Sequence, residues 1–100
     1  MIFRRRFSRV IERQLDLFER ENADLIRRCV LAERAYDGAA RDEAEARYSE
    51  YLDLVEIGVD ELAEMRDAYT ATLDEDAAEA YEAAFARAVR KRLPRFALRL

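Results

Sequence analysis

The chain has 100 residues, of which 51% are apolar and 40% are charged, while glycine and proline together account for three. This length supports one domain, and the scarcity of helix breakers predicts helices with charged faces. There is no histidine, and Cys29 is the single cysteine, so an intrachain disulfide is impossible and we expect no metal or other cofactor site. No apolar run has the length of a membrane span, and no signal-peptide apolar segment follows Arg4, Arg5 and Arg6, so we expect a cytoplasmic protein.

Charge is segregated along the chain, although the net charge is only −4. Residues 1–34 carry nine arginines against six acids, and residues 84–100 carry six bases and no acid. Residues 35–83 carry three arginines against sixteen acids. Two basic ends therefore flank an acidic middle, and this pattern bears on the partners that the protein can have.

The first predicted helix runs from about Phe7 to Tyr36. Its apolar residues recur at steps of three and four, which is the heptad spacing of a helix with one buried seam. Asn22 interrupts the seam: either it fixes the register or oligomeric state, or it lies at an edge open to water. The helix ends at Asp37-Gly38, because glycine is favoured just beyond a helix C-terminus. The seam consists of Ile11, Leu15, Phe18, Asn22, Leu25, Cys29, Ala32 and Tyr36.

Two further helices are predicted. One runs from about Arg41 to Thr70 with an equally regular seam. The next begins near Thr72-Leu73-Asp74-Glu75, which matches a capping box, and continues to about Arg92, beyond which Pro94 prevents elongation. Because the connections are short, neighbouring helices should be antiparallel. The sequence thus predicts an all-α, three-helix antiparallel bundle in one domain: a long hairpin, a shorter third helix and an apolar C-terminal tail.

Folding the first two helices about Gly38 places position i opposite roughly 77 − i. This registry places Phe18 against Gly58. A glycine inside a helix costs about 1 kcal/mol relative to alanine, and a facing aromatic ring that needs room would explain it. The same registry places Asn22 against Val55, so a third element must supply a hydrogen-bond partner for Asn22 or the residue stays hydrated.

The predicted helix lengths leave a groove uncovered near Gly38. At 1.5 Å per residue the second helix spans roughly 45 Å and the third about 30 Å, so the third does not reach the Gly38 end. We expect an extended tail to cover this groove, within its own chain or by exchange across a dimer; otherwise another protein binds there. The predicted partner groove comprises Leu25, Ile26, Cys29, Val30, Tyr48, Leu52, Phe96, Leu98 and Leu100.

The basic residues near both ends have two interpretations. They are suited to the phosphates of nucleic acid or to anionic lipid headgroups. They are also suited to internal ion pairs, which we prefer: the registry places Arg4 to Arg6 near Asp74, Glu75 and Asp76, and the C-terminal cluster beside Glu56, Asp60 and Glu61. The candidate anion-binding residues are Arg4, Arg5, Arg6, Arg9, Arg87, Arg90, Lys91, Arg92 and Arg95.

We expect no catalytic activity. The nearby carboxylates Glu56, Asp60, Glu61 and Glu64 lack the histidine that di-metal sites in helical bundles use, so we interpret them as a solvated helix face. The leading hypothesis is a helical module for protein–protein interaction or self-association. Its partner would be a second copy, for example in a homodimer, or another helical protein, and not a small-molecule substrate. The alternative is a peripheral binder of nucleic-acid phosphate or acidic lipid through the basic termini.

Overall fold

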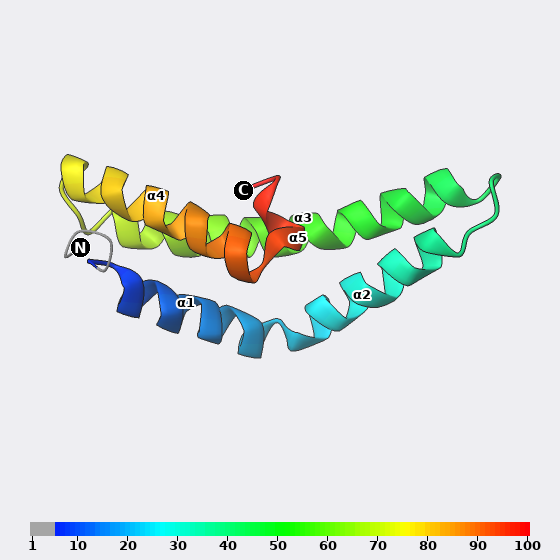
Figure 1. Ribbon diagram of the computed structural model, residues 1–100, viewed down its shortest axis with the longest axis horizontal. Coiled ribbons are helices and arrows are strands. Elements are labelled where there is room, and N and C mark those ends of the chain that lie inside the picture. Colours follow the sequence, from blue (N-terminus) through cyan, green and yellow to red (C-terminus); the bar gives the residue numbers. More distant parts are fainter. Residues whose placement is uncertain (1–5) are drawn as a thin grey trace.

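The computed structural model describes residues 6–100, which form an all-α chain without strands in that range. Four substantial helices pack together, and one short helical turn follows them (Figure 1). The helices are α1 (Ser8–Glu21), α2 (Ala23–Asp37), α3 (Ala44–Thr70), α4 (Glu75–Arg92) and α5 (Pro94–Ala97).

The first predicted helix is divided in two at Asn22, so the expectation of three helices is corrected to four. Asn22 leaves the helical conformation, with φ −115° and ψ 23°. Its backbone N–H and its side-chain Nδ2 both donate to the carbonyl oxygen of Phe18, at 2.9 and 3.0 Å. An asparagine side chain competes in this way with regular helical hydrogen bonding. The amide nitrogen of Asn22 thus has its partner within α1 and not on a third element, and the residue stays partly exposed, as the hydrated alternative expected.

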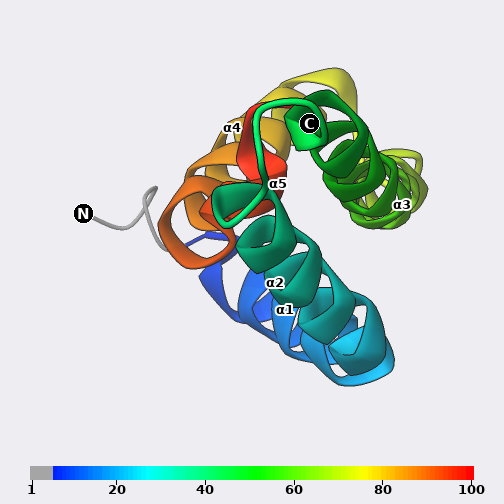
Figure 2. The ribbon, with the colours of Figure 1, turned by 90° about the vertical axis from the view of Figure 1, so that its right-hand side faces the viewer.

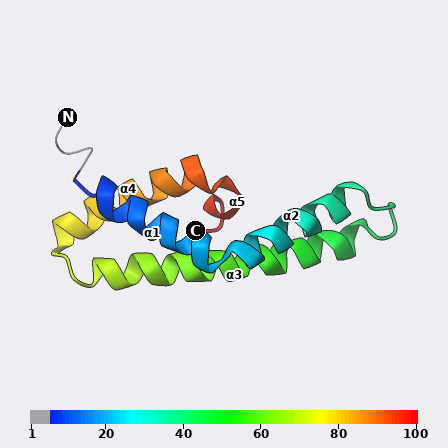
Figure 3. The ribbon, with the colours of Figure 1, turned by 90° about the horizontal axis from the view of Figure 1, so that it is seen from below.

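The chain runs along α1 and α2, returns along α3 and advances again along α4, so that α1 and α4 are parallel (Figures 1 and 3). Seen end-on, the α1–α2 arm, α3 and α4 occupy three corners (Figure 2). The 18 residues of α4 cover only part of the 27-residue α3. The α2–α3 hairpin therefore projects beyond α4 and gives the molecule its extents of 51 × 24 × 22 Å (Figure 1).

Helix α4 begins at a different cap from the predicted one. Oδ1 of Asp74 accepts a hydrogen bond from the N–H of Ala77 at 2.8 Å, and the helix starts at Glu75. Thr72 instead donates its hydroxyl to the carbonyl of Tyr69 at 2.7 Å. The capping box expected from Thr72 to Glu75 is therefore wrong, although acids in the first turn and bases in the last turn suit the helix dipole.

The C-terminal tail forms a helical turn and not an extended strand. Pro94 occupies the first position of α5, where its fixed φ and missing N–H are tolerated. In this turn Phe96 enters the core, at 1% exposed, whereas Leu98 is 97% exposed. The prediction of an extended tail is therefore wrong. Phe96, Leu98 and Leu100 do not share one side, because helical spacing separates residues that an extended chain would align.

Gly58 does face an aromatic ring, but the nearest ring is not that of Phe18. The three closest heavy atoms to a Cβ built on Gly58 all belong to Phe96. Phe18 packs edge-on against Phe96, with ring centroids 5.6 Å apart. The tail therefore inserts a ring beside the glycine, and Phe18 lies behind that ring.

Candidate docking groove between α1 and α4

The partner groove predicted near Gly38 is largely occupied by the chain itself. The packing of α2 on α3 and the α5 turn bury Leu25, Cys29 and Phe96. Four further residues of the set are half-buried: Ile26, Val30, Leu52 and Leu100. Only Tyr48 and Leu98 are exposed, and the Tyr48 ring lies 5.1 Å from the ring of Tyr36. A partner would reach little of this set without displacing the tail.

Arginines hold the tail against the preceding helices. At the end of α4, Arg92 contacts Asp16 and Glu19 of α1, each at 2.5 Å. Arg95 donates to Glu33 of α2 at 3.0 Å and to the Tyr51 hydroxyl at 3.2 Å. The clustered bases Arg92 and Arg95 thus pair internally, but the predicted partners are wrong. Arg92 reaches α1 from the end of α4, and Arg95 in α5 reaches Glu33 of α2. Glu56 of α3 pairs instead with Arg99, which donates to it at 2.7 Å.

The basic N-terminal group is only partly described. Arg4 and Arg5 lie outside the described residues, so their predicted pairing near Asp74 remains a prediction. The exposed guanidinium of Arg6 lies 5.0 Å from the centroid of the Phe7 ring. Within residues 6–100, neither Arg6 nor Arg9 forms an ion pair, so the ion pair expected between Arg6 and the acids at 74–76 is not formed. The expected position of Arg6 near that turn remains a prediction.

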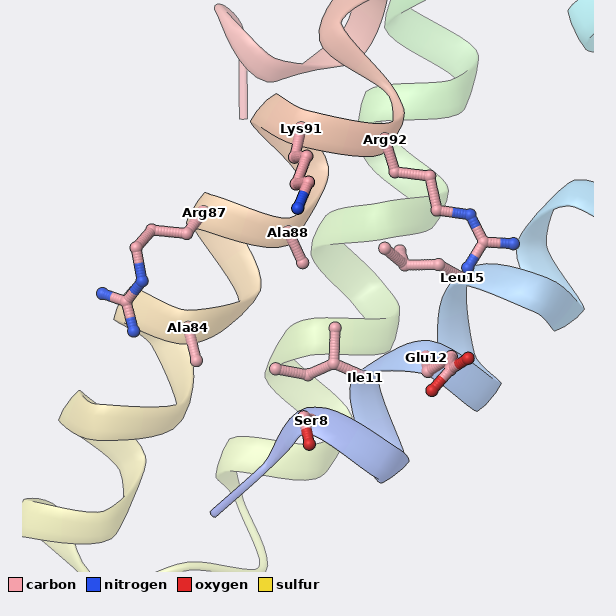
Figure 4. Close-up of a pocket in the computed structure, with 9 residues that line it drawn as sticks. All are labelled: Ser8, Ile11, Glu12, Leu15, Ala84, Arg87, Ala88, Lys91 and Arg92. Carbon is pink, nitrogen blue, oxygen red and sulfur yellow. The ribbon is translucent and has the colours of Figure 1, made fainter. Parts of the chain in front are cut away.

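An open groove of about 570 Å³ runs between the parallel helices α1 and α4 (Figure 4). The α1 side supplies the bulky side chains of Ile11 and Leu15, which also reach into the core. The apolar residues on the facing α4 side are only the small Ala84 and Ala88, one turn apart, and the missing side-chain volume leaves the space. The complete lining is Ser8, Ile11, Glu12, Leu15, Ala84, Arg87, Ala88, Lys91 and Arg92.

The α4 edge of the groove is basic. Arg87 and Lys91, one helical turn apart, are exposed and form no ion pair with any described residue. In Figure 4 the ammonium group of Lys91 extends over Ala88, and Arg87 projects outward beside Ala84. Arg92 is different, because its contact with Asp16 raises its pKa and its charge is already matched. Glu12 is the one acid on the α1 edge, so the net field of the groove favours an anion.

Sequence reasoning identified Arg87 and Lys91 but not the groove in which they lie. The groove joins α1 residues to α4 residues at least 69 positions later in the chain, and the sequence of neither helix shows that the two are in contact. One local signal was present: Ala77, Ala84 and Ala88 follow helical spacing on the α4 face that meets α1. Small residues on a core-facing stripe indicate a shallow surface at that point.

The described residues include neither an activated thiol nor a cluster of metal ligands. Burial raises the pKa of the Cys29 thiol, which outweighs the opposite effect of nearby Arg95, so the thiol stays protonated and weakly nucleophilic. Among residues 6–100, no three Cys, Asp or Glu side chains cluster so as to hold a metal ion. No helix in the same range combines the length and apolar character that crossing a membrane requires. Comparison with protein-family models, curated protein sequences and solved structures finds no match to this chain.

Proposed function

We propose that this protein is a non-catalytic helical interaction module whose docking site is the groove between α1 and α4. The observation that carries the proposal is the combination of an apolar floor with two unpaired cations on one rim. Three helices that pack at three corners leave a groove between each pair, and a fourth amphipathic helix completes such a bundle. The fitting partner is an acidic amphipathic helix with apolar side chains directed at Ala84 and Ala88 and carboxylates beside Arg87 and Lys91.

The charges on the rim favour an acidic partner and make its binding sensitive to salt. Arg87 and Lys91 are unpaired in the free protein, so a partner carboxylate does not compete with an internal acid for them. Opposite charges at an interface favour the correct partner and speed encounter, while apolar burial in the floor supplies affinity. We therefore expect binding that weakens with salt, because exposed charges are screened.

Binding of a designed peptide tests this proposal directly. The probe is a fluorescein-labelled helical peptide of about three heptads with leucine on one face and flanking glutamates, followed by fluorescence anisotropy. The Arg87→Glu/Lys91→Glu variant should weaken binding at least about tenfold, or roughly 1.4 kcal/mol. The matched control, Arg34→Glu/Arg41→Glu, makes the same charge change at exposed positions outside the groove and should bind like the parent. Equal effects of the two variants would refute the groove as the site.

The second candidate function is binding to an anionic surface, and exposed Arg87, Arg90 and Lys91 without ion pairs in residues 6–100 favour it. The two functions differ in their need for the apolar floor. Ala84→Gln keeps every charge but fills the floor, so it should weaken peptide binding and leave adsorption to phosphatidylserine vesicles unchanged. A parent protein that binds the vesicles but not the peptide would support the second function and overturn the first.

A further inference from the structure

The outer face of α3 carries an isolated apolar side chain within an acidic border. Ile57 is 50% exposed, and its neighbours one and two turns away along the same edge are Asp53, Asp60 and Glu64. All three carboxylates are exposed, and none forms an ion pair with another described residue. One exposed isoleucine needs no explanation by itself. What distinguishes this one is that its acidic border matches the features we propose for a partner of the α1–α4 groove.

We propose that the occupant of the groove is the acidic outer face of α3 from a second copy of this chain. The inference rests on the proposed function, because it names the partner of the same groove. Ile57 of the incoming copy would lie on the apolar floor at Ile11 and Ala88. Its acidic edge would then run beside Arg87 and Lys91.

Helix geometry supports the charge match. Asp60 and Glu64 are four residues apart on α3, and Arg87 and Lys91 are four residues apart on α4. At 1.5 Å per residue, both pairs have the same rise of about 6 Å, so two carboxylates can face two cations at once. Glu12 on the opposite rim disfavours an acid there. The incoming helix should therefore be rotated so that Asp60 and Glu64 lie towards α4.

The two surfaces lie on opposite sides of one molecule, so they meet only between copies. Helix α3 packs against both α1 and α4 and lies behind the groove (Figure 4). Its inward residues are Val55, Gly58, Val59 and Leu62, and at about 100° per residue Ile57 falls on the far side of the helix. Groove-to-face contact is consequently heterologous, and each copy added leaves a free groove at one end and a free face at the other.

Sedimentation velocity and light scattering at low and high salt test this inference on the full chain. The average mass of the parent should rise continuously with concentration, without a plateau at a dimer, and salt should suppress the rise. Arg87→Glu/Lys91→Glu and Asp60→Lys/Glu64→Lys should each remain monomeric. The controls Arg34→Glu/Arg41→Glu and Asp37→Lys/Asp42→Lys change exposed charges elsewhere and should associate like the parent.

Mixing the two charge-reversed variants gives the sharpest result. Neither can bind itself, but the lysine face of one variant matches the glutamate groove of the other, so an equimolar mixture should regain association. A mixture that stays monomeric would overturn the inference, as would a parent that associates through a surface insensitive to both reversals. If the parent is monomeric at every concentration while the acidic peptide still binds at the groove, the proposed function stands and only the second copy is excluded as its partner.

Discussion

The ring of Phe96 occupies the space in which residue 58 would carry a side chain. A Cβ built on Gly58 would lie 2.8 Å from Cδ1 and 2.9 Å from Cζ of that ring, closer than packed carbon atoms approach. The glycine in α3 and the phenylalanine in the tail, 38 positions later, therefore form one structural unit. This contact fixes the tail on the bundle and accounts for a glycine in the interior of a 27-residue helix.

Gly58→Ala should destabilise the protein even though alanine is the better helix former. The added methyl group displaces a buried ring, and overpacking of this kind costs about 1–3 kcal/mol, which exceeds the gain of about 1 kcal/mol in helix propensity. Gly38→Ala is the matched control: its Cβ would lie 3.5 Å from the carbonyl oxygen of Arg34, an ordinary contact, and should change stability little. Urea unfolding measures both. In a Phe96→Ala background, Gly58→Ala should become neutral or stabilising; an unchanged cost there would contradict the contact.

Two apolar residues of the tail should differ strongly in their contribution to stability. Phe96→Ala removes a buried ring from beside Phe18 and Gly58 and should cost about 3–5 kcal/mol. Leu98→Ala changes a side chain that is 97% exposed and should stay within about 0.5 kcal/mol of the parent. Thermal melts of the two variants provide the measurement. Comparable costs would mean that the tail binds through Leu98 as well, against the helical turn described above.

Two tail arginines offer a second contrast. Arg95 is 22% exposed and bonds both Glu33 and Tyr51, so Arg95→Met should cost about 1 kcal/mol or more. Arg99 is 48% exposed and bonds only Glu56, so Arg99→Met should cost about 0–0.5 kcal/mol. The midpoints of urea unfolding curves give the relative stabilities of the two variants, provided that both show the same dependence of the unfolding free energy on urea concentration. The reverse order of the two costs would show that burial does not govern these ion pairs.

The Tyr81 hydroxyl should make stability fall at high pH. Burial raises the pKa of Tyr81 to about 12, while its bond to Gln14, 2.8 Å long, acts in the opposite direction. The unfolded chain releases this proton near pH 10, so the native state binds more protons between pH 10 and about 12. The stabilisation is therefore complete below pH 10 and lost above it, by up to about 1.4 kcal/mol per pH unit.

Tyr81→Phe isolates this contribution from the other tyrosines. Because the variant lacks the hydrogen bond to Gln14, its free energy of unfolding at neutral pH should be lower than that of the parent by roughly 1 kcal/mol. Between pH 10 and 12, however, its free energy of unfolding should decline less steeply than that of the parent. Denaturant titrations at a series of pH values provide the two slopes. Identical slopes would mean that the Tyr81 hydroxyl reaches solvent and ionises near its ordinary pKa.

Local sequence signals were enough to predict where most helices begin and end. Heptad spacing predicted helical segments whose observed ends, at Asp37, Thr70 and Arg92, lie close to the expected ones. Pro94 ended α4, and the length of α4 left the α2–α3 hairpin projecting. These outcomes depend on caps, propensities and periodicity, which act over a few residues and so can be recognised in the chain itself.

The contacts between side chains of different helices depend on the complete fold and could not be predicted in the same way. A seam asparagine is compatible with a continuous helix or with a break, and the ring facing Gly58 could come from any element that reached it. The partners of Arg92 followed from the packing of α4 on α1, and those of Arg95 from the direction of the chain after Pro94. Ion pairs contribute too little energy to specify either arrangement. The α1–α4 groove likewise exists because two distant helices pack in parallel with alanines between them, and contacts over such sequence separations depend on the whole fold.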